Sequence, residues 1–322
     1  MLHRFLGATG LKVSRIGLGT MTWGTETDEH EAADQLRVFV EAGGTLLDTA
    51  ASYGAGHTER LVGSLLGSVV SRDDVVIATK GGITRRAGER VVDVSRRALL
   101  HDLETSLTRL GVDHVDLWQL HTWSDDVPLD ETLSALDYAV SSGRSRYVGV
   151  SNYTGWQTAR AATHQESVAG RAAIASTQVE YSLLQRGIER EVSPASIALG
   201  LGILAWAPLG RGVLTGKYRT GLPADSRAAS PTFDRYVGEH LTPRTSRIVE
   251  AVWRAAEGLD MQPAEVALAW VRDQPGVTAP IIGARTSAQL RASLAVEEIT
   301  LPEEITDALD DVSAPPTGYP EA

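Results

Sequence analysis

The sequence predicts an α/β protein, a (β/α)8 TIM barrel that forms one domain over residues 1–322. Short apolar runs alternate with longer segments of helical period, and about eight such units fit within 300 residues. The apolar runs are continuous rather than alternating, which is typical of parallel strands buried on both faces. Chains of this length are often single domains when they form α/β barrels.

The units follow one another without a linker or a low-complexity segment. We expect strands at 13–19, 45–50, 74–80, 114–121, 146–152, 173–181, 201–208 and 277–284. We expect helices at 28–42, 57–67, 95–110, 130–142, 154–165, 188–199, 244–258, 286–296 and 302–312. The first helix opens on Asp28 with Glu31 three residues later, which is a capping pattern, and it ends before Gly43. The connection 208–243 is too long for a turn, so it is a candidate functional loop.

A doubly wound sheet is the rival fold. For a dinucleotide it would place G-x-G-x-x-G directly after the first strand. The first strand here ends within GLGTMTWG, whose glycines at 17, 19 and 24 do not match that spacing. The barrel is therefore favoured.

Composition excludes several classes of function. The net charge is −11, which argues against general binding of nucleic acid or of an anionic membrane. The chain has no cysteine, so it forms no disulfide and no thiolate metal site. It has no apolar run long enough for a membrane span and no signal-peptide segment at its start. We expect a cytoplasmic protein that acts on a small molecule, and the sequence does not predict its oligomeric state.

Four reactive side chains follow three neighbouring strands. The stretch LLDTAASYG at 46–54 supplies Asp48 and Tyr53, the next strand ends at Lys80, and the fourth ends at His121. Alone, each has an ordinary explanation, such as a helix cap, a packing residue, a surface charge or a core histidine. Because the carboxyl ends of barrel strands share one mouth, we expect these four to meet there.

Together these groups suit proton transfer. A free phenol has a pKa near 10, and a nearby ammonium lowers it by favouring phenolate. Asp48 would keep Lys80 charged, and His121 would orient a carbonyl oxygen. A metal site at Asp48 and His121 is disfavoured, because neither HxH, HExxH nor a carboxylate cluster accompanies them.

A carbonyl that accepts a proton also needs a hydride, and other strand ends suit a nicotinamide cofactor. Ser151, Asn152 and Gln178 can pair with a carboxamide, and Trp206 can stack on its ring. The stretch 207–217, which ends at Lys217, and Arg227 downstream suit a pyrophosphate. Arg285, at an expected helix start after Gly283, suits a ribose phosphate.

These motifs, in order and spacing over nearly the whole chain, resemble the aldo-keto reductase superfamily, in particular its bacterial and potassium-channel-β-like branch. The matching segments are GLGTMTWG, LLDTAASYG, ATKGG, LWQLH, YVGVSNY, TQVEYSLLQR, APLGRGVLTGKY and PIIGARTSAQL. The resemblance implies a barrel that binds NADP(H) and reversibly reduces aldehydes or ketones to alcohols.

By position, the resemblance assigns Tyr53 as general acid, Lys80 and Asp48 as its support, and His121 as the carbonyl-orienting residue. It implies a preference for NADPH over NADH. The implied cofactor contacts comprise Gly19, Thr20, Asp48, Ser151, Asn152, Gln178, Trp206, Ala207, Leu209, Gly210, Gly212, Lys217, Arg227, Gly283, Arg285 and Gln289. We expect the substrate pocket to be lined by Met21, Trp23 and Trp123.

Three positions depart from the family pattern. Ala292 and Ser293 stand where many relatives carry an acidic residue and an asparagine that contact adenine, so those contacts are not expected here. Ala207 stands where a serine is common.

Two other functions remain open. One is an NADP(H)-binding regulatory subunit that senses redox state, although its channel-associated examples often carry asparagine in place of His121. The other is a barrel isomerase or lyase with Lys80 as a Schiff base, which would require a depressed lysine pKa.

Overall fold

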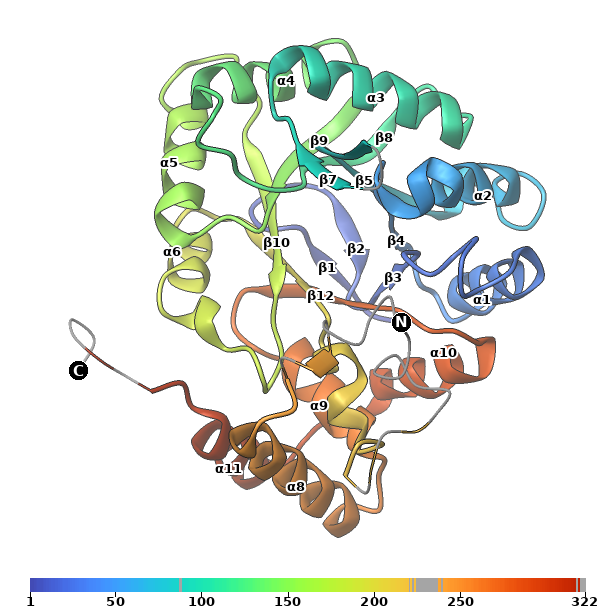
Figure 1. Ribbon diagram of the computed structural model, residues 1–322, viewed down its shortest axis with the longest axis vertical. Helices are drawn as coiled ribbons and strands as arrows, with labels where there is room; N and C mark the ends of the chain where they lie inside the picture. The colour runs from blue at the N-terminus through green and yellow to red at the C-terminus, as the bar shows by residue number, and fades with distance from the viewer. Residues whose placement is uncertain are drawn as a thin grey trace.

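A closed ring of eight parallel strands forms the centre of the molecule and confirms the predicted barrel (Figure 1). The computed structural model describes residues 1–86, 89–219, 221, 223, 237–238, 240–316 and 318. Around the ring the strand order is β10-β11-β12-β3-β4-β5-β8-β9. These strands are β3 (Gly17–Gly19), β4 (Leu46–Asp48), β5 (Val76–Gly81), β8 (Val115–Leu120), β9 (Ser145–Ser151), β10 (Ile174–Glu180), β11 (Gly202–Trp206) and β12 (Val277–Ile282).

Helices surround the ring and complete the βα units (Figure 1). The described helices are α1 (Glu29–Glu41), α2 (His57–Leu65), α3 (Arg96–Leu110), α4 (Leu129–Ser141), α5 (Gly155–Glu166), α6 (Val192–Ala198), α8 (Pro243–Gly258), α9 (Pro263–Arg272), α10 (Ser287–Leu294) and α11 (Glu303–Ser313). As the sequence predicted, α1 begins after Asp28, whose side chain accepts a 2.9 Å hydrogen bond from the N–H of Glu31. Among the described residues, no helix is long and apolar enough to cross a membrane.

Within the barrel units, three elements differ from the sequence prediction. The expected first strand divides into β2 (Lys12–Ser14) and β3, because the Ser14 hydroxyl donates to the carbonyl of Ile16 and accepts from backbone N–H groups of the neighbouring strand. The expected helix 188–199 is shorter and begins at Val192. Helix α9 was missed because eight of its ten residues are buried, so its sequence lacks a polar face.

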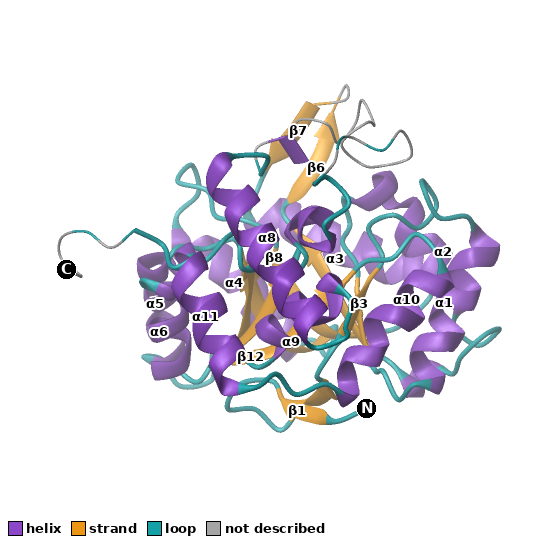
Figure 2. Ribbon diagram, turned by 90° about the horizontal axis from the view of Figure 1, so that it is seen from below, coloured by secondary structure: helices purple, strands orange, loops and turns teal. Residues whose placement is uncertain are grey.

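A short antiparallel hairpin closes the amino-terminal end of the barrel. It pairs β1 (His3–Phe5) with β2, and Leu6 and Val13 pack with Leu46 and Leu117 inside the ring. Figure 2 shows β1 at one end of the molecule and a second hairpin at the other. The lower barrel is therefore a filled apolar core, and only the carboxyl ends of the strands are left for chemistry.

The two-residue period of the strands places polar groups above this core. Leu46 and Ala78 belong to the apolar layer inside the barrel. Two residues further along the same strands, Asp48 and Lys80 point into the barrel at the next level. The register that builds the core therefore also positions the reactive groups.

A buried ion pair ties α2 to α3 beneath the loop that follows β4. Glu59 is completely buried and accepts 2.8 Å and 3.1 Å hydrogen bonds from Thr79 and Arg109. Arg109 also donates to the carbonyl of Ala51 at 3.1 Å. Its guanidinium carbon lies 2.2 Å from where a Cβ would stand at Gly56, so only glycine fits there.

We predict that Arg109→Met lowers the free energy of unfolding by about 3 kcal/mol, because it leaves the Glu59 carboxylate buried without its counter-ion. Urea denaturation at neutral pH would measure this change. Arg37→Met is the matched control, since Arg37 pairs with Asp34 in a largely exposed ion pair and should cost less than about 1 kcal/mol. Equal small losses in both variants would contradict the prediction.

Candidate active site

A buried carboxylate and a buried ammonium form the centre of the site. Lys80 donates to both carboxylate oxygens of Asp48, at 2.8 Å and 2.7 Å, and to the carbonyl of Thr49 at 2.8 Å. Gln178 adds a 2.7 Å hydrogen bond to Oδ1 of Asp48 from across the barrel. Lys80 is 1% and Asp48 3% exposed. Every donor of the ammonium is thus satisfied inside the barrel.

Lys80 is held in its charged form. Burial opposes the charge, but the nearby Asp48 carboxylate and Tyr53 favour it, so the pKa of Lys80 is raised above its usual value. A raised pKa makes Lys80 a poor nucleophile at neutral pH, because a Schiff-base lysine must lose its proton. The lysine is suited to act as a fixed positive charge.

Tyr53 lies directly beside this charge. The Lys80 ammonium is 5.3 Å from the centroid of the Tyr53 ring. Tyr53 starts the short helical turn η1 (Tyr53–Gly56), and its N–H donates to the carbonyl of Ala50 at 3.1 Å. Arg109 holds the carbonyl of Ala51 in the same loop. Sequence analysis missed Arg109 and Glu59 as supports, because nothing along the chain identifies them as partners.

His121 faces Tyr53 from the end of β8. The two rings meet edge to face with centroids 6.0 Å apart. Burial, together with the positive charges of Lys80 and Arg90, lowers the pKa of His121 to about 3. Its Nδ1 is buried and has no hydrogen-bond partner in the described part of the chain. The imidazole is therefore neutral and one of its nitrogens remains available.

The side chains expected to bind a carboxamide form a connected network. Asn152 donates to the carbonyl of His121 at 3.0 Å and to Ser151 Oγ at 3.1 Å, and it accepts from the Trp206 indole at 3.0 Å. Ser151 donates to the carbonyl of Gln178 at 2.9 Å. Asn152 has a φ of 59°, in the left-handed region that asparagine tolerates better than most residues. The structure thus brings all four residues together at the mouth.

The loop after β11 makes a tight turn built largely from small residues. Three consecutive residues, Gly210, Arg211 and Gly212, have φ values of 54°, 58° and 89°. A Cβ at Gly212 would lie 3.1 Å from the Lys217 ammonium, so this cation sits over the bare backbone. A turn that includes Leu209 begins at Ala207, which also has positive φ, and is closed by a 2.8 Å hydrogen bond from the N–H of Gly210 to the carbonyl of Ala207. Arg227, the other expected pyrophosphate ligand, lies outside the described residues.

The loop after β12 carries the groups expected near a ribose phosphate. Gln289 accepts a 3.0 Å hydrogen bond from the backbone N–H of Arg285. A Cβ built on Gly283 would meet nothing within 4 Å, so this backbone borders open space. At the adjacent strand β3, Gly19 is in close contact with β12, and the Thr20 hydroxyl donates to the carbonyl of Asp48 at 3.0 Å.

The expected substrate-pocket residues separate in the structure. Met21 is exposed, but Trp23 is 0% exposed and its indole donates to Gln35 at 3.0 Å. Trp23 is therefore a core residue, and the expectation that it lines the substrate pocket is wrong. The reason is that the turn after β3 folds its side chain inward. Trp123 packs edge to face against Tyr153 and Trp156, with centroids 5.2 Å and 5.4 Å away.

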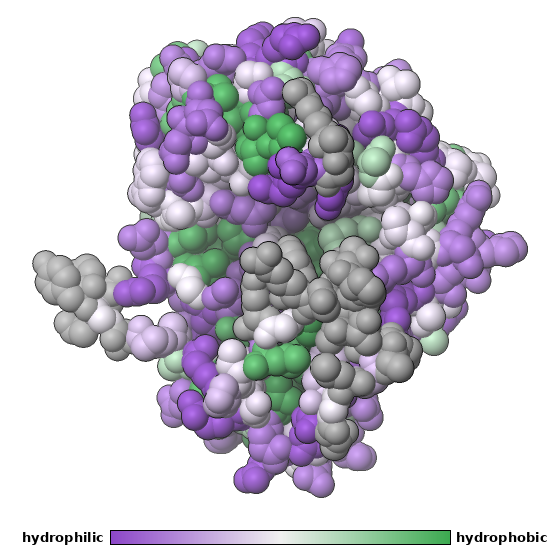
Figure 3. All heavy atoms as spheres, in the orientation of Figure 1, coloured by the Kyte–Doolittle hydropathy of each residue, from purple (hydrophilic) through white to green (hydrophobic). Residues whose placement is uncertain are grey.

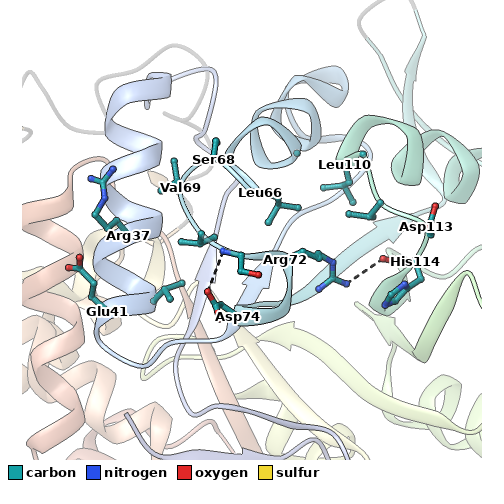
Figure 4. A pocket seen from close by; sticks show the side chains of 17 residues that line it. Arg37, Glu41, Leu66, Ser68, Val69, Arg72, Asp74, Leu110, Asp113 and His114 are labelled. Carbon is teal, nitrogen blue, oxygen red and sulfur yellow. Dashed lines mark hydrogen bonds between the residues drawn. The ribbon is translucent and has the colours of Figure 1, made fainter.

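One hollow borders this site, and a second lies apart from it. One of about 650 Å³ opens beside Asn152 and Trp206 and also includes Glu180 and Arg190. The face that carries the strand ends is hollowed near its centre (Figure 3). Another hollow of about 920 Å³ lies between the ends of α1, α2 and α3, where Arg72 is bonded to the carbonyl of His114 (Figure 4). That hollow is at the amino-terminal face, away from the reactive groups.

Among the described residues, no group of three or more histidines and carboxylates is placed to hold a metal ion.

Comparison with known proteins identifies the family. The model of the "Aldo/keto reductase family" matches residues 15–314. The chain is 37% identical to the uncharacterized oxidoreductase YrpG of Bacillus subtilis (strain 168), over 100% of this chain and 99% of that protein. It is 34% identical to Protein tas of Escherichia coli (strain K12), over 97% of each. It is 32% identical to a probable voltage-gated potassium channel subunit beta of Oryza sativa subsp. japonica, over 97% of this chain and 96% of that protein.

These matches confirm the resemblance that the motifs carried, and they support an oxidoreductase role. The family model covers residues 15–314, which include all eight strands of the closed barrel. The chain belongs to the aldo/keto reductase family.

Proposed function

We propose that this chain reduces aldehydes or ketones to alcohols with NADPH, reversibly, and that Tyr53 is the general acid. The observation that carries the proposal is the buried Lys80–Asp48 pair, whose ammonium lies 5.3 Å from the centroid of the Tyr53 ring. A phenol with a normal pKa is a weak acid at neutral pH. A fixed ammonium beside it stabilises phenolate and so makes proton donation easier.

Asp48 has a supporting part in this proton transfer. Its carboxylate offsets the cost of burying Lys80 and fixes the position of the ammonium through two hydrogen bonds. The carbonyl of Thr49 accepts a further hydrogen bond from Lys80, and Gln178 donates a further one to Asp48. The tyrosine donates its proton to the carbonyl oxygen as that oxygen gains negative charge, and the phenolate is then stabilised by Lys80.

His121 positions the carbonyl in this proposal. A neutral imidazole can donate one N–H hydrogen bond without adding a full positive charge to the site. Because its pKa is lowered to about 3, His121 stays neutral at the pH where Tyr53 must act. It therefore orients the substrate and leaves proton donation to Tyr53.

The described residues also fit a nicotinamide dinucleotide. Ser151, Asn152 and Gln178 offer amide and hydroxyl groups around Trp206, whose ring is half-buried at the mouth. The bare backbone at Gly212 with the Lys217 ammonium over it suits a pyrophosphate. Open space at Gly283 lets a ligand approach the backbone beside Arg285. When bound, NADPH supplies the hydride that the carbonyl carbon receives.

A second candidate is an NADP(H)-binding regulatory subunit that senses redox state. The observation that favours it is the likeness to proteins named as potassium channel β-subunits. The same pocket would serve both roles, so turnover distinguishes them. A binding-only subunit has no need for the Tyr53 hydroxyl, whereas a reductase depends on it.

We predict that Tyr53→Phe lowers kcat by about 10²–10⁴-fold, the usual contribution of positioned proton transfer. NADPH binding, followed by quenching of protein fluorescence, should be largely retained. Tyr138→Phe on α4 is the control, since that tyrosine is exposed and distant in sequence. If Tyr53→Phe turned over near the normal rate, the assignment of the acid would be wrong.

We predict that the His121 ring does not titrate between about pH 8 and about pH 5, because its pKa is lowered to about 3. A histidine in the unfolded chain takes up its proton at about pH 6.5. Because folded His121 does so only at lower pH, the free energy of unfolding decreases as the pH falls from about 6.5 towards 3. NMR of the imidazole signals would measure this, with His121→Asn to assign the resonance. A midpoint near 6.5 would contradict the neutral role.

We predict that Arg285→Ala raises the Kd for NADPH by about tenfold or more, while the Kd for NADH changes little, because only NADPH carries the 2′-phosphate. Isothermal titration with each nucleotide would show the difference. Arg291→Ala is the control, because Arg291 is exposed on α10, the helix that begins two residues after Arg285. An equal rise in Kd for both nucleotides would show that Arg285 does not contact the 2′-phosphate.

A further inference from the structure

A second hairpin stands over the mouth of the barrel. It pairs β6 (Ile83–Arg86) with β7 (Glu89–Val92) in antiparallel fashion. The hairpin leaves the carboxyl end of β5, two residues after Gly81, whose carbonyl accepts a 2.9 Å hydrogen bond from the N–H of His121. In Figure 2 it rises from the end of the molecule opposite β1. Sequence analysis did not predict this element.

The register of the hairpin places two cations side by side. Arg85 pairs with Arg90 across the strands, and Ile83 pairs with Val92 on the same face. Val92 packs against the main hydrophobic core, so this face is turned toward the body of the protein. Like charges directly opposite each other are destabilising in a strand pair. Two arginines on one face beside a reactive site make that face locally positive, which suits an anion at Arg90.

Arg90 is the better-defined member of the pair. It is exposed, and it forms no ion pair with any residue in the part of the chain that the structure describes. Its positive charge reaches the His121 ring, where it contributes to the lowered pKa of that imidazole. The guanidinium therefore lies within electrostatic range of His121, the residue that would orient the carbonyl.

The ring order separates this cation from the expected pyrophosphate loop. The hairpin follows β5, whereas the loop with Gly212 and Lys217 follows β11. In the closed ring β10-β11-β12-β3-β4-β5-β8-β9, β5 and β11 are four steps apart in either direction. They lie on opposite sides of the barrel. An anion held by Arg90 therefore belongs to the substrate side of the mouth.

We propose that Arg90, with Arg85 beside it, binds an anionic group of the carbonyl substrate, either a carboxylate or a phosphate. This inference rests on the proposed carbonyl reduction and adds the chemical class of its substrate. In a chain with a net charge of −11, a local pair of arginines at the mouth also attracts an anion that the rest of the surface repels. The Arg90 guanidinium forms hydrogen bonds to the anion and places the carbonyl beside Tyr53 and His121.

The test compares matched carbonyl compounds that differ in charge. One pair is 4-carboxybenzaldehyde and methyl 4-formylbenzoate, and a second pair is glyceraldehyde 3-phosphate and glyceraldehyde. kcat/KM is measured with NADPH for wild type, Arg90→Gln, Arg90→Lys and Arg160→Gln. Arg160 is the control, because it is an exposed arginine on α5 and its loss changes the net charge equally.

We expect wild type to prefer the anionic member of at least one pair by about tenfold or more, mainly through KM, and added salt should weaken this preference. Arg90→Gln should remove most of the preference, Arg90→Lys should restore part of it, and Arg160→Gln should leave it unchanged. The pair that shows the effect identifies the anion as carboxylate or phosphate. The KM for NADPH should not change in Arg90→Gln, since the cofactor phosphates lie elsewhere.

Two outcomes would overturn the inference in different ways. Turnover of both members of each pair with equal kcat/KM, or a preference that survives Arg90→Gln, would overturn the anionic substrate class alone. No turnover of any carbonyl by wild type, with NADPH still bound, would overturn the proposed reduction and this inference with it.

Discussion

The ion pair between Lys80 and Asp48 is the interaction on which the rest of the site depends. Both groups are almost completely buried, and burial of charge is costly unless each charge is paired and its hydrogen bonds are satisfied. Here the ammonium has three acceptor contacts, and the carboxylate receives a further bond from Gln178 across the barrel. The result is a positive charge that cannot move away from Tyr53. A solvent-exposed lysine would give the phenol much less help, because water screens its field.

The barrel gives this pair its position. Alternation along β4 and β5 carries the side chains from an apolar layer to Asp48 and Lys80 one level higher. The loop that bears Tyr53 is held from below by Arg109, which is itself neutralised by buried Glu59. Packing beneath the mouth and chemistry at the mouth are therefore parts of one connected structure.

The sequence predicted most of what depends on local pattern. Continuous apolar runs and the order of βα units were sufficient to predict the barrel, and the strand ends were sufficient to predict that Asp48, Tyr53, Lys80 and His121 lie together. Features that depend on tertiary packing were not predictable. From its position in the sequence, Trp23 was expected to line the substrate pocket, but the fold buries it against Gln35. Glu59 and Arg109 are 50 residues apart, and no local signal pairs them. The β6–β7 hairpin is polar and short, so it lacks the continuous apolar run from which the other strands were predicted.

The central claim is that a fixed ammonium beside a tyrosine makes the phenol an effective acid. The most direct measurement is the rate of NADPH oxidation with a panel of small carbonyl compounds, in wild type and in Lys80→Met, from acid to alkaline pH. The account predicts turnover in wild type and a loss of at least about 10²-fold in the variant, with NADPH still bound. Near-normal turnover with an unchanged pH profile in Lys80→Met would contradict it.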